Sequence, residues 1–435
     1  MRRTKALNLV FAGLFVTSAF ITGSNLVFAA SHETVLHNFG RDKDGLWPYG
    51  EVIFGLHGEL YGTTISGGAF DYGAVFELQP GRDGRFSERV LHSFQSNGKD
   101  GYWPYAGLVS DAAGNLYGVT VGGGQKNYGT VFELTVQGDN TWKEIILYNF
   151  AGGTDGELPY ASLIFDAAGN LYGTTYQGGN SGCRGIGCGI VFELTPGAHG
   201  KWTETILHTF QDDGVDGHQP YAALVFDSAG NLYGTTAYGP TYGYFNNGPG
   251  TVFKLAPKGN GQWKEKLLFT FCPGNDCSGG ANPFSNLIFD SKGNLYGTTD
   301  SGGSMYGDGT VFELSPGAKG QWTEKALYAF CSPYSCQDGN TPYAGVIFDT
   351  HGNLWGTTTA GTISGAYCGG SGCGIVFELV PGNHGTWTEQ VVHSFSGEDG
   401  GIPYAGLAFD NSGNLCGTTS TGGAYGNGTV FEIRP

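Results

Sequence analysis

Apolar and polar residues alternate along this chain in short runs, and no helical periodicity interrupts them. Turn residues separate the runs. In one representative unit an Asp-Ala-Ala-Gly-Asn turn follows the first run, a glycine-rich loop the second and a Pro-Gly turn the third. Such alternation between turns is typical of β-strands. The strands predicted for this unit cover residues 160–166, 171–175, 190–194 and 202–210.

The same unit recurs along the whole chain. Its core phrase is Asn-Leu-Tyr-Gly-Thr-Thr or a close variant, and each copy runs on to a Gly-Thr-Val-Phe-Glu-Leu segment. Seven copies occur, with their leucines 55 to 63 residues apart. Those leucines are Leu60, Leu116, Leu171, Leu232, Leu295, Leu354 and Leu415. Four strands per unit at this period predict an all-β fold, a single seven-bladed β-propeller with four-stranded blades.

The two ends of the repeat predict how the ring closes. The last unit stops after its third strand, Gly428 to Ile433, and lacks a fourth. One orphan strand, Glu33 to Phe39, precedes the first unit and matches the fourth-strand segment Val391 to Phe395. We therefore expect the N-terminal strand to complete the last blade, which covers sheet edges that would otherwise invite aggregation.

The first 29 residues have the pattern of a signal peptide. Three basic residues precede an apolar run from about Leu7 to Ile21, and small residues at Val27 and Ala29 fit the positions that a signal peptidase reads. The run is too short and interrupted for a membrane span. We expect a signal peptide over 1–29, a propeller over 30–435, no membrane span after cleavage, and a secreted, periplasmic or cell-surface location.

Composition supports strands and limits the partners. Glycine provides 79 of 435 residues, roughly 18% against a usual ~7%. Without the three basic residues of the leader, 18 basic and 38 acidic side chains remain, a formal charge near −20. Such a surface repels phosphate backbones and anionic lipid. Nucleic acid is therefore not an expected partner, and we expect a monomer.

Eight of the nine cysteines form four Cys-x4-Cys pairs, and no histidine accompanies any pair. In an exported protein this spacing favours four local disulfides, while zinc binding is the alternative. The ninth, Cys416, stands where other units carry Tyr or Trp, so we expect a buried free thiol. The expected disulfides join Cys183 to Cys188, Cys272 to Cys277, Cys331 to Cys336 and Cys368 to Cys373.

The Leu-Tyr-Gly-Thr-Thr…Gly-Gly…Gly-Thr-Val-Phe-Glu-Leu unit resembles the GloVer (Gloeo/Verruco) tandem repeat of secreted bacterial proteins, over nearly all of the mature chain. Its Asp-x-x-Gly-Asn-Leu-Tyr turn is also similar to repeats of NHL-type and two-component sensor propellers. The resemblance implies a bacterial surface or extracellular repeat protein. It supplies no catalytic residues, and family members often end in a sorting or anchoring segment, which does not follow Arg434-Pro435 here.

One face of the predicted propeller is the better candidate for binding. The loops between strands two and three, and between blades, vary in length and hold all four cysteine pairs and the long inserts 237–250 and 359–374. Variable loops on a rigid scaffold are common binding sites, and the inserts place the expected site toward blades three to six. Aromatic rings there could pack on sugar rings, or could merely order the loops. The candidates are Trp47, Trp103, Tyr238, Tyr242, Tyr244, Phe245, Tyr306, Tyr334 and Tyr367.

Six inter-blade loops carry Asp-Gly before a Pro-Tyr, and their carboxylates could bind calcium near the channel mouth. Asx turns are the alternative, which we favour because the feature repeats with the blade. The six are Asp44, Asp100, Asp155, Asp216, Asp338 and Asp399. His37, His92, His208 and His393 share one strand-four position and are interpreted as packing residues rather than metal ligands.

Catalysis would need residues that break the repeat. Glu51 lies on an inner strand, Glu157 and His218 in inter-blade loops, and Asp300 after the second strand of the fifth blade. Paired carboxylates could hydrolyse a glycosidic bond, and a base beside an acid could eliminate a uronate. Six arginines in the mature chain are too few for an arginine cluster of the sialidase kind, and nucleophile-elbow, phosphate-loop and zinc-protease motifs do not occur.

Two hypotheses follow. The first is a secreted propeller that binds extracellular polysaccharide or a cell-surface protein through its loop-rich face. The second is a polysaccharide-active hydrolase or lyase that uses the unrepeated carboxylates. Because charged residues are few and mostly periodic, the sequence favours binding.

Overall fold

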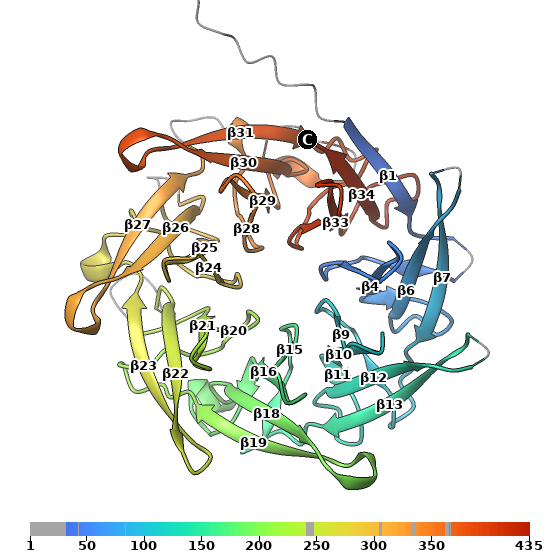
Figure 1. Cartoon of the computed structure of the whole chain (residues 1–435), viewed down its shortest axis with the longest axis horizontal. Helices are drawn as coiled ribbons and strands as arrows, with labels where there is room; N and C mark the ends of the chain where they lie inside the picture. The colour runs from blue at the N-terminus through green and yellow to red at the C-terminus, as the bar shows by residue number, and fades with distance from the viewer. Residues whose placement is uncertain are drawn as a thin grey trace, which may run out of the picture. The chain divides into compact units, whose positions relative to one another are not determined.

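The computed structural model describes residues 32–435 except 42, 83, 139, 241–247, 304–306, 332–335, 362–364 and 366. The signal peptide predicted over 1–29 lies outside these residues and remains a prediction. Ser31–Pro435 forms one compact unit. In its described part, the strands build seven four-stranded sheets arranged as the blades of a propeller around a central axis (Figure 1). The all-β, seven-bladed prediction is confirmed.

The first four blades follow, from inner to outer strand. Blade 1 has β3 (Ile53–Phe54), β4 (Leu60–Thr64), β6 (Ala74–Pro80) and β7 (Phe86–Ser93). Blade 2 has β9 (Val109–Ser110), β10 (Leu116–Thr120), β12 (Thr130–Val136) and β13 (Trp142–Asn149). Blade 3 has β15 (Ile164–Phe165), β16 (Leu171–Thr175), β18 (Ile190–Pro196) and β19 (Trp202–Thr209). Blade 4 has β20 (Val225–Phe226), β21 (Leu232–Thr236), β22 (Thr251–Gly259) and β23 (Gln262–Thr270).

The other three blades repeat this plan. Blade 5 has β24 (Ile288–Phe289), β25 (Leu295–Thr299), β26 (Thr310–Pro316) and β27 (Trp322–Ala329). Blade 6 has β28 (Ile347–Phe348), β29 (Leu354–Thr358), β30 (Ile375–Pro381) and β31 (Trp387–Ser394). Blade 7 has β32 (Ala408–Phe409), β33 (Leu415–Thr419), β34 (Thr429–Arg434) and β1 (His32–Asn38).

Shorter elements lie in the loops. Three two-stranded sheets pair β2 (Gly45–Leu46) with β5 (Ser66–Gly67), β8 (Gly101–Tyr102) with β11 (Gly122–Gly123), and β14 (Gly156–Glu157) with β17 (Gln177–Gly178). The 3-10 turns of the described chain are Cys183–Gly185, Ala198–Gly200, Pro273–Asn275, Ala318–Gly320, Cys336–Asp338, Gly369–Ser371 and Asn383–Gly385. No helix among the described residues is long and apolar enough to cross a membrane.

The innermost strand is shorter than the sequence predicts. We expected a strand over 160–166, but only Ile164–Phe165 pairs with β16. Residues 160–163 instead run from the inter-blade loop along the central channel. They have no strand partner, because only Ile164 and Phe165 of this run pair with β16. The other three strands of the unit lie where they were predicted.

The N-terminal strand closes the ring. β1 pairs antiparallel with β34, from His32 opposite Arg434 to Asn38 opposite Thr429, and forms the outer edge of blade 7 (Figure 1). A register shift between Val35 and His37 sits where the outer strands of the other blades also shift. The predicted closure is confirmed.

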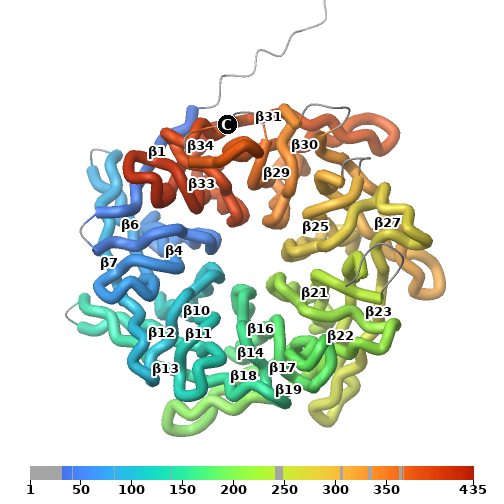
Figure 2. The backbone as a smooth tube through the Cα atoms, turned by 180° about the vertical axis from the view of Figure 1, so that it is seen from behind, coloured from blue at the N-terminus to red at the C-terminus, as the bar shows by residue number. Residues whose placement is uncertain are grey.

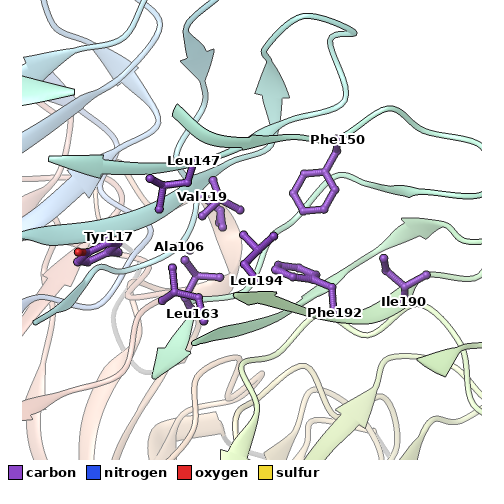
Figure 3. Packing of buried hydrophobic residues seen from close by; sticks show 11 residues of the cluster. Ala106, Tyr117, Val119, Leu147, Phe150, Leu163, Ile190, Phe192 and Leu194 are labelled. Atoms are coloured by element: carbon purple, nitrogen blue, oxygen red, sulfur yellow. The ribbon is translucent and has the colours of Figure 1, made fainter. Parts of the chain in front are cut away.

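The hydrophobic core lies between neighbouring blades rather than inside them. Figure 3 shows the cluster between blades 2 and 3, where Tyr117 and Phe150 face Leu163 and Phe192. At the end of each outer strand a buried phenylalanine packs edge-on against the third strand of the next blade, as Phe150 does on Phe192 at 5.3 Å between centroids. The glycine of each Leu-Tyr-Gly phrase is needed because a Cβ on Gly173 would lie 2.6 Å from the ring of Phe192.

The two faces of the propeller are built differently. Figure 2 shows the propeller from the side opposite to that of Figure 1. The turn face carries the Asp-x-x-Gly-Asn turns and the turns between strands three and four. There Asp166 accepts hydrogen bonds from the backbone N–H groups of Ala168 and Asn170, the Asn170 amide and the Tyr172 hydroxyl. The loop-rich face carries the loops between strands two and three and the loops between blades.

Candidate binding site

A cavity of about 340 Å³ follows the propeller axis, where the first strands of all seven blades meet. At its loop-rich end each blade contributes one aromatic residue, directly after the inter-blade proline. These rings contact one another in a closed circle, with neighbouring centroids 4.7–5.5 Å apart. The members of this channel ring are Tyr49, Tyr105, Tyr160, Tyr221, Phe284, Tyr343 and Tyr404.

Aromatic packing fixes the channel ring. Three neighbouring pairs are stacked, with interplanar angles of 10–18°, and the other neighbours meet edge-on, both of them favourable arrangements. The hydroxyls of Tyr221 and Tyr343 hydrogen-bond to each other, and burial raises the pKa of both. The ring is therefore a neutral, rigid floor beneath the channel mouth. Sequence reasoning missed it, although a Pro-Tyr or Pro-Phe pair in every unit was the available signal.

Glu51 lies inside the channel, at a level where Gly107, Gly345 and Gly406 take its place in other blades. Asn286 Nδ2 donates to its Oε1 at 3.5 Å from across the channel. Burial raises the pKa of Glu51, opposed by that bond and by the Gly406 backbone. A Cβ on Gly406 would collide with the carboxyl. Among the described residues no second carboxylate lines this cavity, so Glu51 lacks the partner that glycosidase chemistry requires.

Asp300 lies close to the channel ring. It follows β25, and its backbone N–H donates to the carbonyl of Asn282 at 3.1 Å. Burial raises its pKa to about 6, against a hydrogen bond with Ser301. Its charge in turn raises the pKa of Tyr343 and Tyr404, two members of the channel ring.

The residue before the inter-blade proline adopts the left-handed backbone region in every blade, with φ between 52° and 59°. For residues other than glycine this region costs of order 1–3 kcal/mol unless the surroundings enforce it. Two backbone bonds do so: Trp103 N–H donates to the Tyr72 carbonyl at 3.0 Å, and the Trp103 carbonyl accepts from Val121 N–H at 3.1 Å. We call these seven residues the mouth positions: Trp47, Trp103, Leu158, Gln219, Asn282, Thr341 and Ile402.

Because the recurring bonds of this clamp are between main-chain groups, the mouth side chains can differ from blade to blade. Trp47 and Trp103 are 42% and 45% exposed. The Trp47 N–H binds Asn427 in the blade 7 loop, as Trp103 binds Tyr72 in the blade 1 loop. Each tryptophan thus lies beside a loop with a further exposed ring. A fifth exposed ring, Tyr128, lies in the blade 2 loop, where its carbonyl accepts from the Leu158 N–H. We call these five residues the aromatic half of the mouth: Trp47, Phe70, Trp103, Tyr128 and Tyr425.

Blades 3 to 5 form a polar half. Glu157 lies in β14 opposite Gln177, half-buried, and burial raises its pKa. His218 exchanges backbone hydrogen bonds with Tyr238, and burial lowers its pKa so that the imidazole is neutral near pH 7. Tyr238 is half-buried, with its ring 6.4 Å from Phe284 of the channel ring. Among the described residues, no other carboxylate contributes to the raised pKa of Glu157 or Asp300.

The remaining aromatic candidates do not gather around one point. Tyr367 is 47% exposed and packs against Gly426 of blade 7. Large exposed rings of the described residues lie mainly on blades 7, 1 and 2, away from the inserts that suggested blades 3 to 6. The other candidates lie outside the described residues: Tyr242, Tyr244, Phe245, Tyr306 and Tyr334.

The Asp-Gly loops bind the blades to one another. Asp100 accepts from the Gln95 backbone and lies 3.4 Å from His92 and near Glu144 of the next blade. Burial, together with Asp100, raises the pKa of Glu144 to about 9. Asp155 and Glu204 repeat the arrangement with Tyr148 between them. These carboxylates thus have hydrogen-bonding roles, and calcium binding remains a prediction.

The cysteine predictions are confirmed. All four Cys-x4-Cys pairs are disulfide-bonded, in loops of the loop-rich face. Cys416 is a buried free thiol.

The sequence profile of the Gloeobacter/Verrucomicrobia repeat matches residues 25–186 and 184–431. The chain belongs to this repeat family. The match covers nearly all of the propeller, so the seven blades described above show how repeats of the Gloeobacter/Verrucomicrobia family close into a ring. None of the curated proteins matches the sequence.

Solved structures similar to this member of the repeat family show the same fold. One is the extracellular domain of a candidate hybrid two component system from B. thetaiotaomicron, with 13% identity and a TM-score of 0.53 over 90% of this chain and 40% of that one. Another is an ancestral GH74 enzyme, with 10% identity and a TM-score of 0.56 over 90% of this chain and 48% of that one. The chain thus spans less than half the length of both.

Proposed function

We propose that this protein is a secreted propeller that binds extracellular glycan at the channel mouth of its loop-rich face. The observation that carries the proposal is the pair Trp47 and Trp103, two exposed indoles that the same backbone clamp holds at the same place in neighbouring blades. A rigid pair of rings at the blade repeat distance presents two platforms to one extended ligand.

The chemistry around the pair suits a sugar chain. The C–H face of a pyranose packs on an aromatic face, and rigid rings lose little conformational entropy on binding. In the polar half, the half-buried Glu157 and Tyr238 carry a carboxylate and a hydroxyl that can hydrogen-bond sugar hydroxyls. A formal charge of −17 for the whole chain favours a neutral glycan over an acidic one.

The proposal is tested on a glycan array and by pull-down with insoluble neutral polysaccharides. We expect binding by the wild type and at least a tenfold loss in Trp47→Ala/Trp103→Ala, because stacking contacts are worth about 1 kcal/mol or more each. Ile206→Ala, which removes an exposed apolar side chain from outer strand β19, is the matched control and should bind normally. Equal binding by the double variant and the control would contradict the proposal.

Polysaccharide cleavage is the alternative, and the raised pKa of Asp300 beside the channel ring is the observation that favours it. A carboxyl of pKa about 6 suits a general acid. A reducing-sugar assay on the glycans that bind decides between the two. Product release that disappears in Asp300→Asn or Glu51→Gln would show an enzyme, whereas binding without release supports the glycan-binding proposal.

A further inference from the structure

The seam between blades 7 and 1 departs from the repeat at three positions, all on the turn face. Cys416 replaces the tyrosine or tryptophan of the Leu-Tyr-Gly phrase, and Phe86 replaces the tryptophan that begins the outer strand of blades 2 to 6. Gly55 replaces the aspartate of the Asp-x-x-Gly-Asn turn. Each change puts a smaller side chain at a position that the other seams fill.

The other seams show what normally occupies this space. Tyr172 packs edge-on against Phe226 of the next blade, with centroids 5.1 Å apart, and its ring lies 6.4 Å from Trp263. Its hydroxyl donates to Asp166 at 3.2 Å and to Glu193 at 2.9 Å. Tyr117 and Tyr233 repeat the contact with the phenylalanine of the next blade, each with centroids 5.0 Å apart. In these seams a tyrosine ring, with carboxylates accepting from its hydroxyl, therefore fills the space between neighbouring blades.

At the 7–1 seam the same space is a cavity of about 340 Å³. Phe54, Phe86 and Phe409 supply aromatic walls, Cys416 and Glu432 are buried, and the exposed His57 lies at the rim. The size falls within the range of small-molecule sites.

Both carboxylates that would accept a phenol hydroxyl are present at this seam, with Arg434 donating to Glu432 Oε2 at 2.8 Å and leaving Oε1 on the other side of the carboxyl. Cys416 pairs with Glu432 as Tyr172 pairs with Glu193, and Asp410 stands where Asp166 does. Asp410 Oδ2 accepts the Asn414 amide at 2.7 Å, and Glu432 Oε1 is 3.4 Å from the same amide. Neither receives the ring hydroxyl that its counterparts receive. An apolar cavity cut by truncating an aromatic or aliphatic side chain binds small aromatic molecules in its place.

We propose that the 7–1 seam is a binding pocket for a small phenol, which fills the place of the absent tyrosine ring and donates its hydroxyl proton to Glu432 or Asp410. The pocket lies on the turn face and is independent of the glycan site proposed for the loop-rich face. The ligand class follows from the other seams, because the aromatic walls and carboxylate acceptors of this pocket correspond to the groups that surround a tyrosine side chain there.

The test uses p-cresol, the side-chain analogue of tyrosine, and toluene, which lacks the hydroxyl. Titration of the full chain followed by ligand-observed NMR and calorimetry should show one p-cresol bound per chain. Toluene should bind about tenfold more weakly, because it cannot hydrogen-bond a carboxylate. Glu432→Gln should reduce this preference.

Two substitutions use the sister blades as controls. Cys416→Tyr introduces the residue that this position holds in blades 1 to 5 and should abolish p-cresol binding while raising the thermal unfolding midpoint. Tyr296→Cys opens the matching space in blade 5 and should add a second p-cresol site. Circular dichroism melts show whether each variant folds.

Several outcomes would overturn the proposal. They are p-cresol binding that survives Cys416→Tyr, equal affinity for toluene, or no binding by the wild type at millimolar p-cresol. If Cys416→Tyr fails to fold, Cys416→Phe fills the pocket without a hydroxyl and must abolish binding in the same way.

Discussion

The two faces of this propeller use hydrogen bonds of different origin, and the difference explains which face varies. On the turn face the side chains themselves make the bonds: Asp166 accepts four, and Asp111, Asp227 and Asp349 repeat most of them. On the loop-rich face the recurring bonds at the mouth positions are made by backbone N–H and C=O groups, and side chains add to them only in some blades, as the Thr359 and Ser420 hydroxyls do. A side chain that carries structure must recur, whereas one that the backbone already positions is free to change.

The proposed glycan site thus lies on the face where the recurring hydrogen bonds do not depend on the mouth side chain. Trp, Leu, Gln, Asn, Thr and Ile all occupy the mouth positions on nearly the same backbone, with φ spread over only 52–59°. A ligand is then the simplest reason for two of them to be exposed tryptophans. At the 7–1 seam, where Gly55 and Cys416 replace recurring side chains of the turn face, the structure has a pocket.

The largest expected effect tests the turn face. Asp166→Ala removes the acceptor of four hydrogen bonds in blade 3 and should lower the free energy of unfolding by about 2 kcal/mol, since the carboxylate is partly exposed. Leu158→Ala, at the mouth position of the same blade, should cost less than about 1 kcal/mol. Urea denaturation measures both. Equal losses would break the distinction between the faces.

The carboxyl groups of the two faces should titrate with pKa shifts of opposite direction. Burial acts to raise the pKa of Asp166, but hydrogen bonds from Asn170, Ala168 and Tyr172 outweigh it and the pKa is lowered. This contribution to stability is present above the ordinary carboxyl pKa and is lost only as the pH falls through the lower folded value. The seam glutamates that anchor the loop-rich side behave oppositely. Burial raises the pKa of Glu204 to about 7 and, with Asp100, that of Glu144 to about 9.

A raised folded pKa gives stability that is complete below the ordinary pKa, near 4.5, and is lost as the pH rises through the folded value. The urea midpoint should therefore be higher at pH 5 than at pH 8, and Glu204→Gln should reduce this dependence. A midpoint that rises from pH 5 to pH 8 would show that the seam carboxyls are ionised in the folded protein.

The smallest effect on stability should come from extending the aromatic half. Leu158→Trp places a third indole at the mouth position of blade 3. Because backbone groups make the two clamp bonds there, the unfolding free energy should change by less than about 0.5 kcal/mol. Affinity for the glycan bound by the wild type should rise several-fold. Loss of folding in Leu158→Trp would show that the mouth side chains do carry structure.

Much of the fold could be predicted from the sequence because the same pattern of strands and turns recurs in every blade. Seven copies of the Leu-x-Gly phrase, the orphan strand Glu33 to Phe39 and the cysteine spacing predict the ring, its closure and its disulfides. The extent of the first strand was wrong, because alternation cannot show that residues 160–163 lack a neighbour to pair with.

The candidate site was less accessible from the sequence. Glu51, Glu157, His218 and Asp300 stand out as breaks in the repeat, but their separation depends on positions around a ring that spacing along the chain does not encode. The channel ring escaped for the opposite reason. Tyr49 and its six counterparts recur in every blade, and a recurring residue is taken for scaffold until the axis brings all seven together.

The pairing of β1 with β34 has a consequence for the order of folding. These strands are the first and last of the propeller, roughly 400 residues apart, so joining them costs about 5 kcal/mol in chain entropy if nothing else has formed. Blades that assemble first bring the two ends together and reduce this cost. The pairing of β1 with β34, which completes blade 7, should therefore be the last to form as the chain emerges, and the first to open when the folded ring is pulled from its ends.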